Sequence, residues 1–226
     1  MSQLSKNTVS AKNQVDDNES IKLINADNNG LRIMFLGNSI TLHGKKPESG
    51  WNNNWGMAAS AEENDYVHIL MRYINEKVSE PAFCICQGAK FELHYKENID
   101  FYEEYALARE FGADIIIVRL IENCDGKDFD KEKFKKELIR FIRYLSPNKL
   151  PKLLFTTCFW EHPGDIAIEE LSKSADNLLV KLGDLGDNKE MTAIGLFEHE
   201  GVAIHPGDKG MLVIANRIFD VLKDIL

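Results

Sequence analysis

The chain has 226 residues, 44% of them hydrophobic and 28% charged, which allows a sizeable core in one domain or at most two. Its formal net charge of -9, with no basic stripe, argues against nucleic acid or an anionic membrane surface as a partner. No apolar run reaches the length of a membrane span, and the polar N-terminal residues contain no secretion signal, so we expect a cytoplasmic protein.

Residues 1–27 are rich in polar side chains and are expected to form a flexible tail, followed by a single domain over residues 28–226. Apolar runs predict buried strands at 31–37, 81–86, 114–120, 152–158 and 191–196. Helical periodicity predicts helices at 60–78, 98–111, 129–145, 165–183 and 208–225. Alternating strands and helices are typical of a parallel sheet between two layers of helices.

Four polar or flexible residues follow predicted strands: Ser39, Gly88, Asn123 and His205. The carboxyl ends of parallel strands share one edge of the sheet, where ligands bind, so we expect these residues to converge. Ser39 is interpreted as a nucleophile with His205 as its base, and the alternative is a turn serine that only bonds local backbone. The Ser39 and Gly88 N–H groups and the Asn123 amide are expected to stabilise an oxyanion, each by about 3 kcal/mol.

Three sequence blocks resemble those of the SGNH (GDSL-type) hydrolases: Gly37-Asn38-Ser39-Ile40-Thr41, Ile121-Glu122-Asn123 and His205-Pro206-Gly207-Asp208. Asn38 stands where the commoner form of the first block has Asp, and Gly88 fits the second block by position only. The resemblance implies a three-layer α/β/α, flavodoxin-like fold with five parallel strands in the order 2-1-3-4-5. It also implies hydrolysis of an acyl or acetyl ester through an acyl-serine, with no metal and no cofactor.

One position departs from the family pattern. The family usually has an Asp three residues before the base His, and this chain has Val202 there. Such an acid orients the imidazole and stabilises its charged form. Glu200 is the candidate replacement because it is the nearer acid, with Glu198, a backbone carbonyl or a Ser–His dyad as alternatives. The two glutamates also fit ordinary exposed loop positions.

Residues expected to contact the substrate are Asn38, Trp51, Trp55, His94 and Trp160. Aromatic rings stack on sugars, so a short acyl or acetyl group on a polar or carbohydrate alcohol is the expected substrate. For the tryptophans of the loop 42–59, packing on the core is the alternative. The competing functions are a non-catalytic module that binds a glycan or acyl ligand, and a related acyltransferase, lysophospholipase or thioesterase. The sequence does not indicate the oligomeric state.

Overall fold

A six-stranded sheet forms the centre of the computed structural model, which describes residues 20–97, 102–174 and 177–226. The strand order is β1-β3-β2-β4-β5-β6, and β1 is antiparallel to β3 while the other neighbours are parallel. The strands are β1 (Ile21–Ile24), β2 (Arg32–Gly37), β3 (Ala82–Gln87), β4 (Ile115–Arg119), β5 (Lys152–Thr156) and β6 (Leu178–Val180). Strands β2 to β5 are buried almost throughout, which explains their continuous apolar runs.

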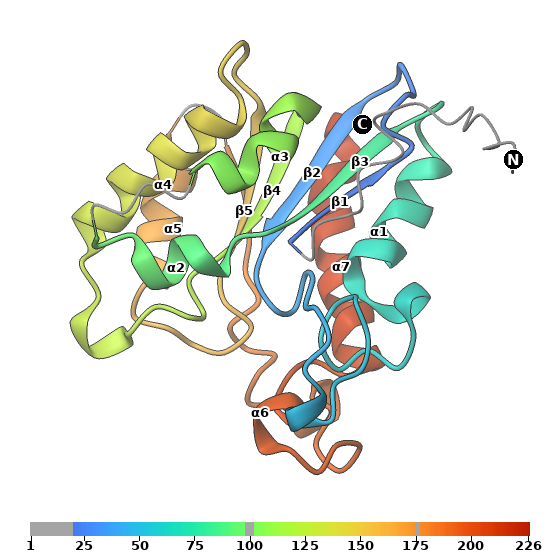
Figure 1. Ribbon diagram of the computed structural model, residues 1–226, viewed down its shortest axis with the longest axis vertical. Coiled ribbons are helices and arrows are strands. Elements are labelled where there is room, and N and C mark those ends of the chain that lie inside the picture. Colours follow the sequence, from blue (N-terminus) through green and yellow to red (C-terminus); the bar gives the residue numbers. More distant parts are fainter. Residues whose placement is uncertain (1–19, 98–101, 175–176) are drawn as a thin grey trace, which may run out of the picture.

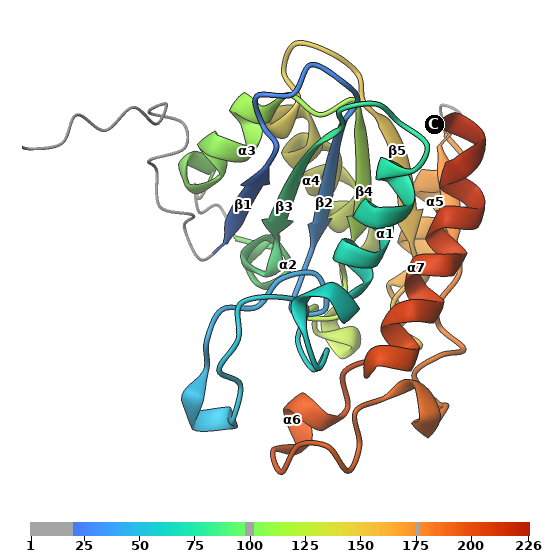
Figure 2. The same ribbon diagram turned by 90° about the vertical axis from the view of Figure 1, so that its right-hand side faces the viewer.

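Helices cover both faces of the sheet, with α1 and α7 on one side and α2 to α5 on the other (Figures 1 and 2). They are α1 (Tyr66–Asn75), α2 (Ala89–His94), α3 (Ala106–Phe111), α4 (Lys131–Leu145), α5 (Asp165–Ser172), α6 (Glu200–Ala203) and α7 (Asp208–Leu222). Each face encloses its own apolar core, so the three-layer α/β/α arrangement predicted from the sequence is confirmed. Within the described residues, no helix combines the length and the apolar character needed to cross a membrane.

The order of the first four predicted strands is confirmed, whereas the fifth was placed wrongly. The last parallel strand is β6, which lies inside the predicted helix 165–183, and α5 ends at Ser172. Three residues are too few for periodicity to distinguish a strand from a helix. Residues 191–196 instead bond to the segment before α7, because Ala193 N–H donates to the His205 carbonyl (2.8 Å). This pairing fixes the backbone of His205.

The tail expected over residues 1–27 is wrong in its last part, and residues 1–19 lie outside the described residues. Ile21 is fully buried in the core between the sheet and α3 to α5, and β1 pairs with the edge of β3. On the same strand, Lys22 Nζ donates to the Asn54 carbonyl (2.5 Å) and pairs with Glu62. Strand β1, which the sequence did not predict, therefore lies in a segment of polar composition. Through Lys22 it connects the long loop after β2 to the sheet.

Candidate active site

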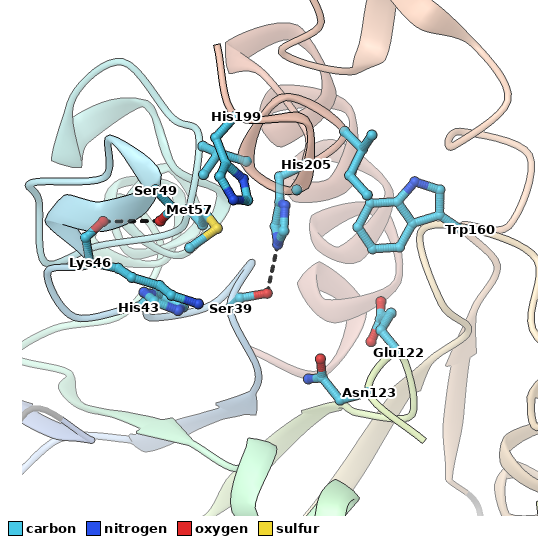
Figure 3. A pocket seen from close by; sticks show the side chains of 13 residues that line it. Ser39, His43, Lys46, Ser49, Met57, Glu122, Asn123, Trp160, His199 and His205 are labelled. Carbon is cyan, nitrogen blue, oxygen red and sulfur yellow. Dashed lines mark hydrogen bonds between the residues drawn. The ribbon is translucent and has the colours of Figure 1, made fainter. Parts of the chain in front are cut away.

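Ser39 lies immediately after β2, in a tight turn at the carboxyl end of the strand. The Thr41 and Leu42 N–H groups donate to the Asn38 carbonyl at 2.9 and 3.0 Å. At Gly37, any Cβ atom would overlap the Thr41 side chain at 1.9 Å, so the turn requires glycine there. The Ser39 Oγ lies 2.8 Å from Nε2 of His205, which comes from the loop before α7 (Figure 3). The predicted pair of Ser39 and His205 is thus brought together.

The imidazole of His205 sits in an environment that keeps it neutral. Its Nδ1 atom is buried, and the Trp160 indole packs edge-on against the ring, with 5.6 Å between centroids. Burial lowers the pKa of His205 to about 4, while the nearby Gly201 and Val202 carbonyls act in the opposite direction. Neither carbonyl reaches Nδ1 with hydrogen-bond geometry, since Nδ1 has no partner. At neutral pH the ring is therefore uncharged and Nε2 can accept the Ser39 proton.

The structure does not bring Glu200 to His205. Glu200 begins α6 and is exposed, as is Glu198. No carboxylate of the described residues forms a hydrogen bond or an ion pair with His205. Val202, at the position of the family's Asp, is buried against Trp51 and its neighbours. Of the alternatives stated above, the geometry matches the Ser–His dyad.

The expected oxyanion donor at Gly88 is also wrong. Its N–H donates to the Gly37 carbonyl at 2.5 Å, which links β2 to the start of α2. A Cβ atom at Gly88 would lie 3.1 Å from the side chains of both Leu36 and Leu120. This glycine therefore serves close packing. By contrast, the Ser39 N–H has no hydrogen-bond partner in the described part of the chain, and Asn123 lines the pocket.

A buried polar network lies directly beneath the pocket. Glu92 of α2 accepts hydrogen bonds from the side-chain amides of Asn123 (2.5 Å) and Asn38 (3.0 Å). Asn38 also donates to Glu122 (2.6 Å) and accepts from Arg119 (3.1 Å), and Arg119 pairs with Glu122. Asn38 is fully buried by these contacts, so its predicted role in substrate contact is wrong. Arg119 is fully buried and its charge is balanced by the ion pair with Glu122.

Glu92 was not among the candidate residues predicted from the sequence, and it lies in α2, a helix that the apolar periodicity did not predict. It is 1% exposed. Burial and, to a lesser extent, the charge of Glu122 raise the pKa of Glu92 to about 7, although the hydrogen bonds from Asn123, Asn38 and the Ile121 N–H oppose the shift. In this network, one buried arginine faces two buried carboxyl groups.

The pocket that contains Ser39 has a volume of about 400 Å³. Figure 3 shows His43, Lys46 and His199 on one side of Ser39 and Trp160 on the other. The remaining lining residues are Ser49, Met57, Glu122, Asn123, Gly201, Val202, Ile204 and His205. Among the residues that the structure describes, no group of three or more His, Cys, Asp or Glu side chains is placed to hold a metal ion.

Besides Asn38, three more of the residues expected to contact substrate lie outside this pocket. Trp51 is fully buried, donates to the His43 carbonyl (3.1 Å) and packs edge-on against Trp55. Trp55 donates to the Ala59 carbonyl (3.0 Å), and His94 on α2 contacts Glu97 (3.1 Å). The packing alternative is therefore correct for the two tryptophans of the loop 42–59. Of the predicted aromatic residues, Trp160 lines the pocket.

Comparisons with known proteins give likenesses of structure alone. No protein family profile and no curated protein matches the chain. A two-domain esterase (CEX) active on acetylated mannans has a TM-score of 0.57 and 17% identity over 86% of this chain, which spans 49% of that structure. The esterase EstA from Pseudoalteromonas sp. has a TM-score of 0.55 and 13% identity, with 86% of this chain and 97% of EstA covered.

A member of the lipolytic protein G-D-S-L family from Veillonella parvula DSM 2008 gives a TM-score of 0.52 and 13% identity, with 85% of this chain and 98% of that one covered. At such low identity these likenesses establish how the chain folds and leave its substrate open. They agree with the mainly parallel sheet and its two helix layers. The chain therefore has the SGNH hydrolase fold.

Proposed function

We propose that this protein is a serine hydrolase that cleaves a carboxylic ester through an acyl-Ser39 intermediate. The observation that carries the proposal is the 2.8 Å contact between Ser39 Oγ and His205 Nε2 at the floor of an open pocket. A serine hydroxyl needs a base at this distance to become a nucleophile. The neutral state of His205 at physiological pH supplies that base.

The reaction follows from the positions of these groups. Ser39 Oγ attacks the ester carbonyl carbon while its proton moves to Nε2 of His205. In this proposal the resulting oxyanion accepts hydrogen bonds from the Ser39 N–H and from the side-chain amide of Asn123, both of which belong to residues that line the pocket. The imidazolium then returns the proton to the leaving alcohol oxygen as the C–O bond breaks, which leaves the acyl group on Ser39. Water, deprotonated by His205, attacks this second ester and regenerates the serine.

No acid of the described residues assists the imidazole, and the nearby carbonyls of Gly201 and Val202 act on it without a hydrogen bond to Nδ1. Both raise the pKa of His205, so they stabilise the imidazolium that forms during the reaction. They do so less than a carboxylate would, since a full negative charge is absent. We therefore infer a slower hydrolase than a complete triad supports.

The substrate we propose is a short acyl ester, such as an acetyl ester, of a polar or carbohydrate alcohol. The pocket's volume of about 400 Å³ suits a small acyl group with part of its alcohol. His43, Lys46 and His199 offer polar contacts on one side, and Trp160 offers a ring face or edge on the other. The structural likeness to an esterase active on acetylated mannans supports the same class.

The second candidate function is a non-catalytic module that binds an acylated glycan in this pocket. Two observations favour it: His205 Nδ1 lacks a carboxylate partner, and the Gly88 N–H is already bonded to Gly37. A ligand-binding module, however, has no need for a serine hydroxyl hydrogen-bonded to a neutral imidazole. Hydrolysis is therefore the conclusion, and an acyltransferase would share its first half.

The test is release of p-nitrophenol from p-nitrophenyl acetate and butyrate by the wild type, Ser39→Ala and His205→Ala. We expect both substitutions to lower kcat by about 10³-fold or more, because the two residues act as one unit. Ser174→Ala, an exposed serine after α5, is the matched control and should keep wild-type activity. Equal turnover by wild type and Ser39→Ala would reject the acyl-serine. Saturable binding of an acetylated glycan without turnover would then favour the binding module.

A further inference from the structure

Glu92 is a buried acid that the reaction described above does not use. Its helix, α2, packs behind the pocket, and its carboxyl group touches both asparagines of the site. We propose that Glu92 is a positioning residue whose carboxylate orients the Asn123 amide, and the turn that carries it, for donation to the oxyanion. This inference rests on the proposed hydrolysis and adds to it a residue outside the sequence blocks that resemble the family.

The hydrogen bonds to Glu92 all run in one direction. Its Oε1 accepts from the Ile121 backbone N–H (2.5 Å) and from Asn38 Nδ2 (3.0 Å), and its Oε2 accepts from Asn123 Nδ2 (2.5 Å). An ionised carboxylate accepts at both oxygens, whereas an amide accepts at its one oxygen only and a protonated acid carries a donor O–H on one of its two oxygens. The carboxylate therefore fixes the orientation of the Asn123 amide, because only the Nδ2 end can donate to it. One hydrogen of Nδ2 is bound, and the second remains for the substrate oxygen.

Glu92 also holds the backbone two residues before Asn123, at Ile121. Ile121 has φ of 120°, a region that β-branched side chains avoid at a cost of about 1–3 kcal/mol. Glu92 holds this residue through its N–H, and the Ile121 carbonyl accepts from Cys124 N–H at 2.8 Å. Cys124 Sγ in turn contacts the Glu92 carbonyl (3.5 Å). The strained turn that presents Asn123 to the pocket is thus fastened to α2 on both sides.

Titration of Glu92 offers a readout of this role. The charged and titratable groups around it are Arg119 on β4, Glu122 and Cys124 in the following turn, and Tyr105 of the 3-10 turn Tyr102–Tyr105. Burial and Glu122 together raise the pKa of Glu92 to about 7, whereas the pKa of His205 is about 4. Protonation of Glu92 turns one acceptor into a donor and frees the Asn123 amide to rotate. Activity should therefore decline below pH 7, well above the pH at which His205 gains its proton.

The variant Glu92→Gln keeps the shape and removes the charge. We expect kcat on p-nitrophenyl acetate to fall about 10²-fold with KM changed less than about threefold, the loss typical of an oxyanion donor. The acid limb of kcat should move from about pH 7 in the wild type toward pH 4 in the variant. If Glu92 acts through Asn123, the double variant Glu92→Gln/Asn123→Ala should be no slower than Asn123→Ala alone.

Asp65→Asn is the matched control. Asp65 is also fully buried and accepts from backbone N–H groups of Gly56 (3.0 Å) and His68 (2.8 Å), but it has no contact with Asn123. Its effect on kcat should multiply with that of Asn123→Ala, as independent sites do. Multiplication of the Glu92→Gln and Asn123→Ala effects, or an acid limb that stays at pH 7 in Glu92→Gln, would overturn the proposal.

A spectroscopic arm separates this proposal from the hydrolysis itself. In protein labelled with ¹⁵N-asparagine, the Asn123 side-chain amide is assigned by its absence from Asn123→Ala. Its resonance should shift with a midpoint near pH 7 in the wild type and in Ser39→Ala, and should not titrate in Glu92→Gln. An Asn123 amide that ignores pH in the wild type rejects the contact. An inactive wild type whose Asn123 amide still titrates rejects the ester hydrolysis alone.

Discussion

In the proposed mechanism His205 acts as a base without a carboxylate partner, and its surroundings explain how the ring can accept a proton under that condition. Desolvation around the ring lowers its pKa to about 4, so the imidazole is ready to accept a proton at any pH above that value. The same desolvation makes the imidazolium costly to form. The carbonyls of Gly201 and Val202 reduce this cost without adding a charge. At neutral pH the His205 imidazole can thus always accept the Ser39 proton, but the imidazolium that results is poorly stabilised.

Glu200→Gln should leave kcat/KM within about twofold of wild type, because an exposed charge that contacts nothing at the site is screened by solvent. Steady-state hydrolysis of p-nitrophenyl acetate at pH 7 and pH 8 measures this. Glu198→Gln, in the same loop and equally exposed, is the matched control. A loss above tenfold in Glu200→Gln, with Glu198→Gln unchanged, would mean that α6 moves to deliver an acid to His205.

The loop between β2 and α1 builds one wall of the pocket around a buried indole. Trp51 is enclosed by Trp55, Phe197 and Val202, so it joins this loop to the segment that carries His205. Its Nε1 donates to the carbonyl of His43, a pocket-lining residue. The opposite wall is Trp160, which is half-buried and packs on His205. Trp51 therefore stabilises the loop by packing, whereas Trp160 forms a wall of the pocket.

Trp51→Ala and Trp160→Ala should separate stability from selectivity. Removing Trp51 leaves a cavity and should lower the free energy of unfolding by about 3–5 kcal/mol. Removing the half-buried Trp160 should cost about 1 kcal/mol and, by widening the pocket, should raise turnover of the butyrate ester relative to the acetate. Urea denaturation and the acetate-to-butyrate ratio measure the two effects. Equal stability losses, or an unchanged ratio in Trp160→Ala, would contradict this division.

The sequence predicts those elements whose signal is local. Strands β2 to β5 carry five or six consecutive residues of a buried run, and the order of these strands follows from the family resemblance. The three residues of β6 and the polar surroundings of β1 give no such signal. Ser39, Asn123 and His205 were found because each lies within a block that resembles the family's.

Glu92 could not be found from its neighbours in the chain. Its hydrogen-bond partners lie 29 to 54 residues away, at Ile121, Asn123 and Asn38, and a glutamate in a short polar helix normally faces solvent. The availability of the Gly88 N–H is likewise a tertiary property, since its acceptor is the Gly37 carbonyl on a neighbouring strand. Burial and partner choice at the site depend on how α2 packs against the ends of β2 and β4.

On the scale of the whole fold, two site residues couple protonation to stability in opposite directions. His205 has a folded-state pKa of about 4 against an ordinary value of 6.5, so between these pH values only the unfolded chain binds that proton. Its contribution to stability falls as pH falls through this window. Glu92 has a folded-state pKa of about 7 against 4.5, so the folded chain binds the proton there. Its contribution to stability rises as pH falls.

The two slopes overlap between pH 6.5 and 4.5 and should cancel in the wild type. Each is at most about 1.4 kcal/mol per pH unit, the value for one proton. Relative to wild type, Glu92→Gln should lose stability as pH falls through this window, because the His205 term is then unopposed. His205→Gln should gain stability over the same range, because only the Glu92 term remains. Urea unfolding of the three proteins at pH 7.5, 6.5, 5.5 and 4.5 measures both differences. The exposed carboxylates are common to all three proteins, so their effect on the free energy of unfolding cancels in each comparison. Parallel stability curves for the three proteins would show that neither group titrates in this window. If the two variants diverge from wild type in opposite directions, the folded state lowers the pKa of His205 and raises that of Glu92, and the two shifts change the pH dependence of stability in opposite senses.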